Sequence, residues 1–326
     1  MDGFDISGNE YAKDKLSSMI SKDRMIPSIL ICGEKGLGKK TMAKYIAAAL
    51  NCESRSGIPC GKCRSCLMAM HSNHPDIIFV TPSSKSGLYR VKEDIRPITS
   101  DAYISPNESG KKVYIIADAE KLNEEGQNAL LKIFEEPPGE TVFILTAENK
   151  QSVLETVLSR VFCFEMSAVS EEEAKHYLTK NGFSDQDAQK AQSAFPGNIG
   201  RQIEYLKGGD VFDSVVIART IVDAVCKKNE YELLKTLSEL DSRNQADNVL
   251  DIILQILGSA LEYSTGANAS MCSYNEGAKA LAAKLTCEMI VKIHDTIAFT
   301  KAKIQGYANL AITAASLTAE IAEIWF

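Results

Sequence analysis

The chain has 326 residues, of which 45% are hydrophobic and 24% charged, and a formal net charge of −7. This composition is typical of soluble globular proteins, and the length predicts two or three domains. The acidic balance argues against a protein that grips nucleic acid by itself, because such domains usually carry a basic face. The polar N-terminal stretch MDGFDISGNEYAKDKL does not resemble a signal peptide. No apolar stretch reaches the roughly 18 residues of a membrane span, so we expect a cytoplasmic protein without membrane contact.

The first part of the chain, residues 1–166, alternates strand-like and helix-like patterns. Four β-rich apolar runs are SILIC (28–32), DIIFV (76–80), KVYIIA (112–117) and TVFILTA (141–147). Helices are predicted over 41–50 and between a cap at Asn123 and the stop at Pro137. Strands that alternate with helices predict an α/β domain with a mostly parallel sheet.

The rest of the chain lacks β-rich runs and is predicted to be helical. Residues 167–208 contain three short helical patterns, the first of which begins with a capping box formed by Ser170 and Glu173. Residues 209–326 contain longer helical patterns, interrupted by an expected loop over 264–277. A helical bundle of this size without chemical motifs predicts a packing or oligomerisation domain.

The segment GEKGLGKKT (33–41) follows the first strand and nearly matches the P-loop pattern G-x-x-x-x-G-K-[ST]. Its candidate phosphate-binding residues are Gly33, Gly36, Gly38 and Lys39. The next position should supply a hydroxyl for magnesium, but it is Lys40. Thr41 lies one residue further along the helix, rotated by about 100°, so its hydroxyl is expected to point elsewhere. The sequence therefore predicts a phosphate cradle that does not bind ATP and magnesium productively.

A second magnesium group is absent from VYIIADAEKL (113–122). P-loop ATPases place two acidic residues after this strand, one to support magnesium and one to activate water. Here the pair is Ala117-Asp118, and a shift of one residue would turn Asp118 to the other face of the strand. We interpret Asp118 as an ordinary acidic residue at a strand end.

Four cysteines cluster in CESRSGIPCGKCRSC with the spacing C-x7-C-x2-C-x2-C. The candidate ligands are Cys52, Cys60, Cys63 and Cys66. Four thiolates can close tetrahedrally on Zn²⁺, so a structural zinc ion is predicted, with an iron–sulfur cluster as the alternative. Proline follows the last cysteine of the bacterial iron–sulfur pattern, whereas Leu67 follows here. His71 and His74 lie nearby and are interpreted as loop residues, because four thiolates already fill a structural site.

The stretch VYIIADAEKLNEEGQNALLKIFEEPPGETVFILTAENKQSVLETVLSR (113–160) resembles the bacterial clamp-loader AAA+ family. The cysteine insertion after the P-loop helix is similar to that family, as are the segments HPD, DIRPI (94–98) and YANLAI (307–312). The resemblance covers essentially the whole chain and is clearest over 20–166. It implies an AAA+ P-loop domain with a zinc-binding insertion, a small helical lid and a helical collar. The corresponding boundaries are 1–166 with the insertion at 52–66, then 167–208, then 209–326.

The family contains ATP-hydrolysing motor subunits of the gamma/tau type and a non-hydrolysing delta-prime type. Motor subunits carry G-K-[ST], an acidic pair and an arginine in the lid. This chain has Lys40, Ala117-Asp118 and, at the lid position, Gly200, with Arg201 one residue late. These departures resemble the delta-prime type, and the gamma/tau type is the alternative. A P-loop kinase would need the same missing groups, and a free-standing zinc-loop DNA-binding protein would need a basic face.

The resemblance also implies partners and a role for Arg160, in the SR pair at 159–160. The implied partners are gamma/tau and delta subunits in a hetero-pentamer, with the β sliding clamp and primed DNA reached through the complex. Arg160 is expected to act as an arginine finger in trans, on ATP held by a neighbouring subunit. The chain is expected to lack ATPase activity of its own while belonging to DNA polymerase III holoenzyme, a DNA-directed DNA polymerase (a nucleotidyltransferase).

Overall fold

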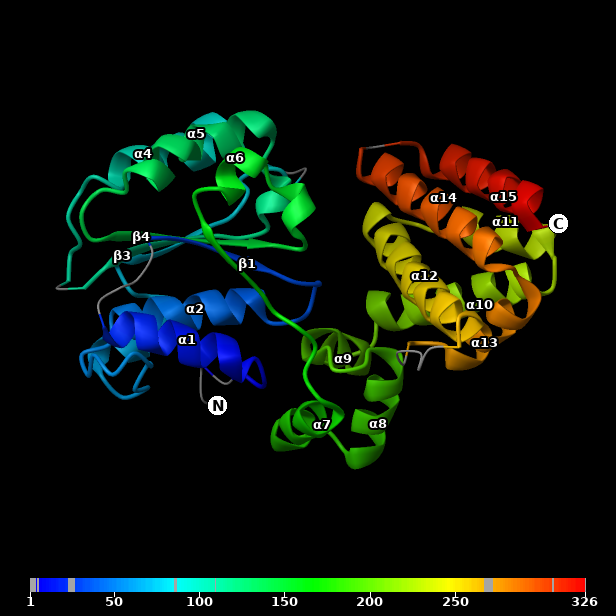
Figure 1. Cartoon of the computed structure of the whole chain (residues 1–326), viewed down its shortest axis with the longest axis horizontal. Coiled ribbons are helices and arrows are strands. Elements are labelled where there is room, and N and C mark those ends of the chain that lie inside the picture. The colour runs from blue at the N-terminus through cyan, green and yellow to red at the C-terminus, as the bar shows by residue number, and fades with distance from the viewer. Residues whose placement is uncertain are drawn as a thin grey trace. The chain divides into compact units, whose positions relative to one another are not determined.

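The computed structural model describes residues 4, 6–22, 27–84, 87–108, 110–266, 272–306 and 308–325. The chain forms two compact units, Met1–Val169 and Ser170–Phe326 (Figure 1). None of the helices in the described ranges combines the length with the apolar character that crossing a membrane requires.

The N-terminal unit is built on a five-stranded parallel sheet with the strand order β2-β3-β4-β1-β5. The strands are β1 (Ser28–Cys32), β2 (Ile77–Val80), β3 (Lys112–Ile116), β4 (Thr141–Ala147) and β5 (Phe162–Glu165). In the register of the sheet, Leu30 of β1 lies between Leu145 of β4 and Cys163 of β5. Because the strands are parallel, their carboxyl ends meet at one edge, where the P-loop and the segment after β3 both begin.

Helices cover both faces of this sheet (Figure 1). Helices α1 (Glu10–Ser21) and α2 (Lys39–Leu50) lie on one face, and α4 (Arg96–Asp101), α5 (Glu124–Glu135) and α6 (Glu155–Leu158) lie on the other. The remaining elements of the unit are the helix α3 (Arg64–Met70), a π-helical turn at Val91–Ile95, and 3-10 turns at Ala119–Lys121 and Lys150–Ser152. Ile29 of β1 packs in the core that contains Met42, and its neighbour Leu30 packs in the core that contains Leu130. Two covered faces explain why the strands read as continuous apolar runs.

The C-terminal unit is entirely helical over its described residues. Its helices are α7 (Glu171–Lys180), α8 (Asp185–Ala194), α9 (Ile199–Leu206), α10 (Asp210–Cys226), α11 (Glu230–Ser238), α12 (Arg243–Ser264), α13 (Asn275–Lys284), α14 (Cys287–Gln305) and α15 (Leu310–Trp325). The capping box at α7 is confirmed, because the Ser170 hydroxyl accepts from the Glu173 N–H at 3.3 Å and the Glu173 carboxylate accepts from the Ser170 N–H at 2.9 Å. Ile253 and Ile256 of the central helix α12 pack with Ile290 of α14 in the core of this unit.

The expected fold class, an α/β P-loop domain followed by helical parts, is confirmed, with three local differences. The edge strand β5 was not predicted, because it has only four residues, begins shortly after the short helix α6 ends at Leu158, and has no fully buried side chain. The P-loop helix begins at Lys39 rather than at residue 41, because Gly38 adopts φ 86° and caps it. The predicted loop over 264–277 is shorter, since α13 begins at Asn275; residues 267–271 of that loop lie outside the described ranges.

Candidate functional site

The P-loop backbone keeps the geometry of a phosphate cradle. Gly33, Gly36 and Gly38 have φ values of 147°, 93° and 86°, which side chains rarely allow. A Cβ atom at Gly33 would lie 2.7 Å from the carbonyl oxygen of Met166, so this position also requires glycine for space. Helix α2 starts immediately afterwards, and its first N–H groups are of the kind that bind anions.

The side chain of the P-loop lysine, Lys39, contacts the backbone of its own loop. Its Nζ donates to the carbonyl oxygens of Gly33 at 2.5 Å and Glu34 at 2.8 Å, and only 8% of the residue is exposed. Burial lowers the pKa of Lys39, and nearby carboxylates, Glu148 foremost, oppose that effect. The ammonium group that would reach the phosphates in a P-loop ATPase therefore has protein oxygens as partners.

Lys40, at the position of the missing hydroxyl, is paired with Asp118 at the end of β3. Its Nζ lies 3.0 Å from Asp118 Oδ2, and Lys121 Nζ lies 2.9 Å from the same oxygen. Burial alone would raise the pKa of Asp118, but hydrogen bonds from Lys121 and Lys40 hold it below its ordinary value. Asp118 is thus not a free strand-end acid, and the chain itself places a cation where a P-loop ATPase joins its loop hydroxyl to magnesium and a strand-end carboxylate.

Ala117, at the first acidic position, is buried and offers no side-chain oxygen. Its carbonyl oxygen accepts from the Tyr89 hydroxyl at 2.5 Å, and the same hydroxyl lies 2.8 Å from the carbonyl oxygen of Val80. The Tyr89 hydroxyl therefore links the carboxyl end of β2 to the residue that follows β3, which is the residue that lacks the carboxylate.

A second acidic residue of this segment, Glu120, was not singled out from the sequence. Burial raises the pKa of Glu120, with further contributions from Glu148 and Asp118. Among the described residues, its Oε2 atom has no hydrogen-bond partner. The carboxyl groups of Glu148, Glu120 and Asp118 lie close enough to Lys39 to act on its charge. Their negative charge offsets the positive charge of the loop lysines and so weakens the attraction of the loop for a triphosphate.

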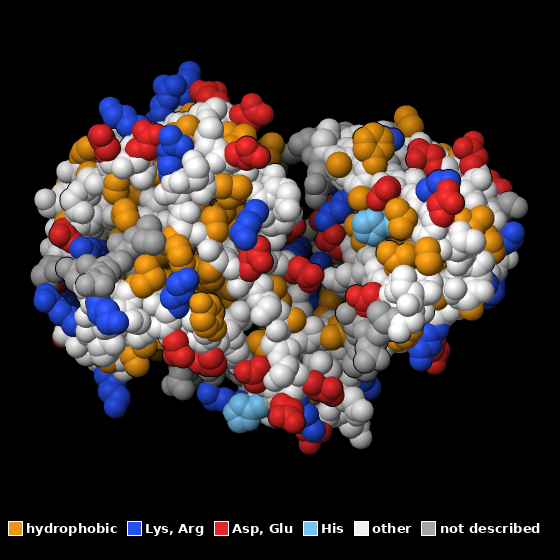
Figure 2. Space-filling view, viewed as in Figure 1, with side chains coloured by type: hydrophobic (Ala, Val, Ile, Leu, Met, Phe, Trp, Pro, Cys, Tyr) orange, Lys and Arg blue, Asp and Glu red, His pale blue; other side chains and the backbone are white. Residues whose placement is uncertain are grey.

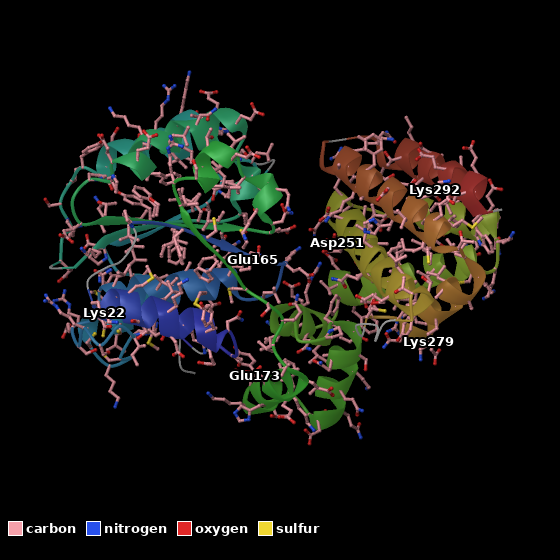
Figure 3. The ribbon with its side chains drawn as sticks, viewed as in Figure 1. Lys22, Glu165, Glu173, Asp251, Lys279 and Lys292 are labelled. Carbon is pink, nitrogen blue, oxygen red and sulfur yellow. The ribbon has the colours of Figure 1, made fainter. Side chains whose placement is uncertain are left out.

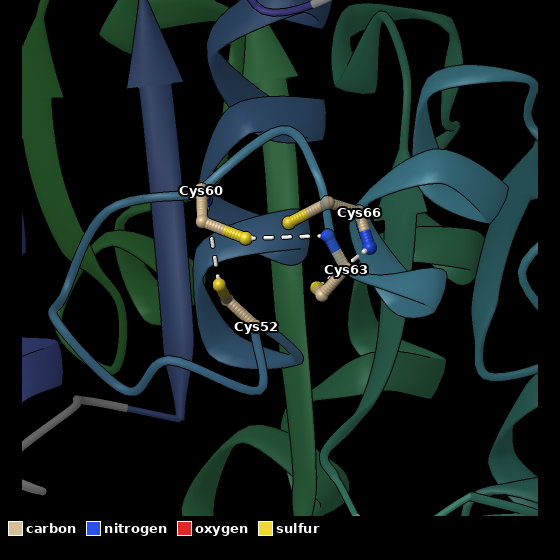
Figure 4. Close-up of side chains that lie close together, drawn as sticks. All are labelled: Cys52, Cys60, Cys63 and Cys66. Carbon is tan, nitrogen blue, oxygen red and sulfur yellow. Dashed lines mark hydrogen bonds between the residues drawn. The ribbon is translucent and has the colours of Figure 1, made fainter.

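The four cysteine sulfurs of the insertion converge (Figure 4). The Sγ atoms of Cys52, Cys60, Cys63 and Cys66 all lie within 4.8 Å of one another. Zn–S bonds of about 2.3 Å in a tetrahedron place sulfurs about 3.8 Å apart, so a small contraction would complete a zinc site. Two of the sulfurs belong to buried residues and two to partly exposed ones.

Backbone N–H groups point at three of these sulfurs. The N–H groups of Cys60, Cys63 and Cys66 donate to the sulfurs of Cys52, Cys60 and Cys63, each at 3.4 Å. Donors of this kind favour the thiolate form, which is the form that binds metal. The backbone N–H groups of Lys62 and Cys63 lower the pKa of Cys60 to about 6, whereas burial raises the pKa of Cys66.

His74 lies outside the cysteine cluster and has a structural role. Its Nδ1 accepts from the Asp76 N–H at 3.1 Å, so Nε2 carries the proton and donates to the Ser65 hydroxyl at 3.0 Å. Burial lowers the pKa of His74, which keeps the ring neutral. Asp76 is fully buried and accepts from the backbone N–H groups of Asn107 at 2.7 Å and Glu108 at 2.8 Å. The HPD segment therefore holds α3, which carries Cys66, against the edge of the sheet.

The candidate lid arginine, Arg201, is buried in the helical unit. Only 5% of it is exposed, and its Nη1 donates to Asn248 Oδ1 of α12 at 2.9 Å. The same Nη1 lies 3.7 Å from Glu204 Oε2, and the guanidinium carbon lies 5.7 Å from the centre of the Phe195 ring. The neighbour at the lid position, Gly200, has no side chain. The arginine thus joins α9 to α12 by contacts within this unit.

We expect Asn248→Ala to lower the free energy of unfolding of this unit by about 2 to 3 kcal/mol, because a buried guanidinium loses its uncharged acceptor. Urea denaturation followed by circular dichroism would measure the change. Glu204→Gln is the matched control: Glu204 is half exposed, and removing such a partner should cost less than about 1 kcal/mol. Equal effects of the two substitutions would contradict the importance of the Arg201–Asn248 contact.

Arg160 follows α6 on the surface of the N-terminal unit. Its Nη1 donates to the Thr156 carbonyl oxygen at 2.8 Å and the Ser159 hydroxyl at 2.9 Å, and its Nε donates to Glu135 Oε1 at 2.5 Å. About a third of its side chain, 34%, is exposed. The guanidinium is therefore partly accessible and is held by residues of its own unit.

Comparisons of this chain with known proteins find a matching family model and several similar proteins. The family model described as DNA polymerase III, delta subunit, matches residues 8–170. A DNA polymerase III subunit gamma from Buchnera aphidicola is 34% identical over 196 residues, which are 58% of this chain and 53% of that protein. A subunit delta' from Bacillus subtilis is 36% identical over 145 residues, 44% of this chain and 43% of that protein. A subunit delta' from Haemophilus influenzae is 28% identical over 238 residues, 72% of each chain.

The chain spans about half the length of the gamma relative and 27% of the tau subunit from Escherichia coli. Among solved structures, a DNA polymerase III gamma subunit-related protein from Thermotoga maritima is similar, with a TM-score of 0.45 and 20% identity; the match covers 95% of this chain and 98% of that one. Because the family match spans residues 8–170, half of the chain, this protein belongs to the DNA polymerase III delta-subunit family of clamp-loader proteins.

Proposed function

We propose that this chain is a non-hydrolysing, delta-prime-type subunit of the DNA polymerase III clamp loader. In this role it helps an ATP-driven complex to load the β sliding clamp onto primed DNA during replication. Relatives named gamma, tau and delta' are all similar to the chain, so the choice rests on the site. The observation that carries it is the contact of Lys40 with Asp118 at 3.0 Å.

This contact opposes magnesium binding in two ways. Lys40 offers no oxygen ligand, and its ammonium group would repel a divalent cation at the position between loop and strand. Ala117 removes the carboxylate that would support the ion. The backbone cradle of Gly33, Gly36 and Gly38 remains able to admit a phosphate group, but without magnesium a triphosphate is not positioned for transfer.

Loss of chemistry at this site is compatible with a role in an assembly with gamma/tau and delta subunits. We assign residues 167–208 to a lid and 209–326 to a collar that contacts other subunits. Exposed apolar side chains on the helical unit support this assignment: Tyr231 is 74% exposed, Phe299 61% and Ile312 71%. Acidic and basic side chains are interspersed on the face shown in Figure 2, which fits DNA binding by the assembled ring rather than by this chain.

We assign a structural zinc ion to Cys52, Cys60, Cys63 and Cys66. Four thiolates leave no open position for a reacting water, so the metal would close the insertion and supply no chemistry. His74, which donates to the Ser65 hydroxyl and accepts from the Asp76 N–H, would hold the neighbouring helix in place around the ion.

Restoring both magnesium groups should restore a metal effect on nucleotide binding. In the double variant Lys40→Thr with Ala117→Asp, we expect magnesium to tighten ATP binding by about tenfold or more, whereas the native chain should show no gain. Isothermal titration with ATP, with and without magnesium, measures this. Lys44→Thr combined with Ala117→Asp is the control, since Lys44 lies on the same helix and contacts Ser72. Equal magnesium effects in both double variants would contradict the site assignment.

Reconstitution tests the proposed function as a whole. The chain is mixed with gamma/tau and delta subunits, and the ATPase activity of the mixture is measured with primed DNA and β clamp. We expect stimulated hydrolysis and clamp loading only when this chain, gamma/tau and delta are all present. A mixture that is equally active without this chain would overturn the proposal.

A further inference from the structure

The inference concerns the residues that hold Arg160 within its own subunit. It rests on the proposed function, in which Arg160 would act in trans on ATP held by a neighbouring subunit. The guanidinium group has five N–H donors. Nε donates to Glu135 Oε1 at 2.5 Å, Nη2 pairs with the same oxygen, and Nη1 donates to Thr156 and Ser159. Four donors therefore have partners in the subunit, which leaves one N–H on Nη2 for any other acceptor.

Glu135 is placed for this contact by the end of a helix. It is the last residue of α5, and Pro137-Pro138 follows two residues later, so the chain turns away from the helix there. Arg160 lies directly after α6, and α5 and α6 pack on the same face of the sheet (Figure 1). Neither side chain is deeply buried, with 48% of Glu135 and 34% of Arg160 exposed. The pair can therefore open without disturbing the core.

Glu135 and a phosphate group compete for the guanidinium of Arg160, because both are negatively charged. An arginine finger stabilises the negative charge that develops on phosphoryl oxygens, and a carboxylate on the same guanidinium neutralises that ability and repels the phosphate. The N–H groups that hold Glu135 are also those that a bidentate contact with phosphate would use. The one remaining N–H on Nη2 could form only a single hydrogen bond, so a bidentate contact of Arg160 with a neighbouring nucleotide requires that phosphate replace Glu135.

We propose that Glu135 is a positioning residue that retains Arg160 on its own subunit and releases it when the nucleotide of the neighbouring subunit comes within reach. In the retained state, the Arg160 side chain is kept from binding other anions before the complex assembles. The exchange costs little, because exposed ion pairs are weak. Glu135 therefore sets how readily the finger engages, while Arg160 performs the contact with phosphate.

The retained state is tested in the isolated chain by NMR of the arginine Nε–H groups. We expect the Arg160 Nε–H signal, assigned by its loss in Arg160→Lys, to be protected from exchange with water in the native chain. Protection should fall in Glu135→Gln, which keeps the size of the side chain but replaces the charged acceptor by a neutral amide oxygen, and should be unchanged in Glu136→Gln. Glu136 is the neighbouring exposed acidic residue and is the matched control. An unprotected signal in the native chain would overturn the proposal.

The consequence is tested in the reconstituted complex, where the contribution of Arg160 is the hydrolysis lost in Arg160→Ala. Glu135→Gln should raise this contribution by about two- to fivefold at low salt, the range expected of an exposed ion pair. The gain should shrink as salt screens the pair, and it should vanish in the Arg160→Ala background. Glu136→Gln should behave like the native chain.

The two possible failures are distinct. If Arg160→Ala lowers hydrolysis but Glu135→Gln and Glu136→Gln act alike, the trans role stands and the retention by Glu135 is overturned. If Arg160→Ala has no effect on an assembled complex, the trans role itself fails and the proposal fails with it.

Discussion

Cys63→Ser should reduce bound zinc from about one ion per chain to a small fraction of that value. The substitution leaves three thiolates, and a hydroxyl group is a much poorer zinc ligand than a thiolate. Cys63 is the better choice than Cys66, because Cys66 is fully buried and its replacement would also disturb packing. Elemental analysis of the purified chain measures the metal directly.

The α/β core should survive this substitution. The two cores of the N-terminal unit are built mainly on the sheet and on helices other than α3, which contributes Ala69. We therefore expect a nearly unchanged far-ultraviolet circular dichroism spectrum and a lower melting temperature. Cys287→Ser is the control, because Cys287 is exposed in the other unit. Native protein that contains no zinc, or contains iron, would contradict the assignment of the metal.

Arg160→Ala should sharply lower clamp loading by the reconstituted complex while leaving assembly intact. Arginine fingers contribute roughly 10³–10⁵ in rate at the site that they serve. A clamp loader has several motor sites, so the loss in total hydrolysis should be much smaller than that. Loading of β clamp onto primed DNA and the hydrolysis rate are measured side by side.

Arg64→Ala is the matched control for this substitution. Arg64 is an exposed arginine of the same unit, 3.4 Å from Glu108, so its removal should change neither assembly nor loading. Gel filtration establishes that each variant enters the complex. If Arg160→Ala assembles and loads clamps at the native rate, the arginine is only a structural residue of the α6 turn.

Much of the fold could be predicted because local patterns and packing agree. Both faces of the sheet are covered by helices, so the four β-rich apolar runs are strands in the structure as expected. Asn123 caps α5 as predicted, and its side chain accepts from the Gly126 N–H at 2.9 Å. β5 was not found in the same way, since it is an edge strand of only four residues, none of which is fully buried.

The candidate sites were predictable where the residues are close in sequence. The four cysteines fall in one loop, so spacing alone indicated the cluster that the structure forms. The pairing of Lys40 with Asp118 joins residues 78 positions apart and depends on how β1 and β3 align in the sheet. The contact of Glu135 with Arg160 likewise depends on the packing of two helices. Contacts between single residues far apart in the chain cannot be predicted from a sequence motif.

Ion pairs between separate elements of each unit could not be predicted from the sequence either. At the end of β5, Glu165, marked in Figure 3, lies 2.7 Å from Lys150. In the helical unit, Asp251, also marked there, pairs with Lys301 of α14. The sequence does not reveal which charged residues meet, because charged residues are common everywhere on protein surfaces.

ATP turnover by the isolated chain tests the central claim most directly. Purified protein is incubated with ATP and magnesium, and phosphate release is compared with that of Lys39→Ala, which removes the P-loop lysine. If the Lys40–Asp118 contact and Ala117 have replaced the magnesium site, both proteins should release phosphate at the same background rate. Turnover by the native chain that Lys39→Ala abolishes would contradict the account and identify an ATP-hydrolysing subunit of the gamma/tau type.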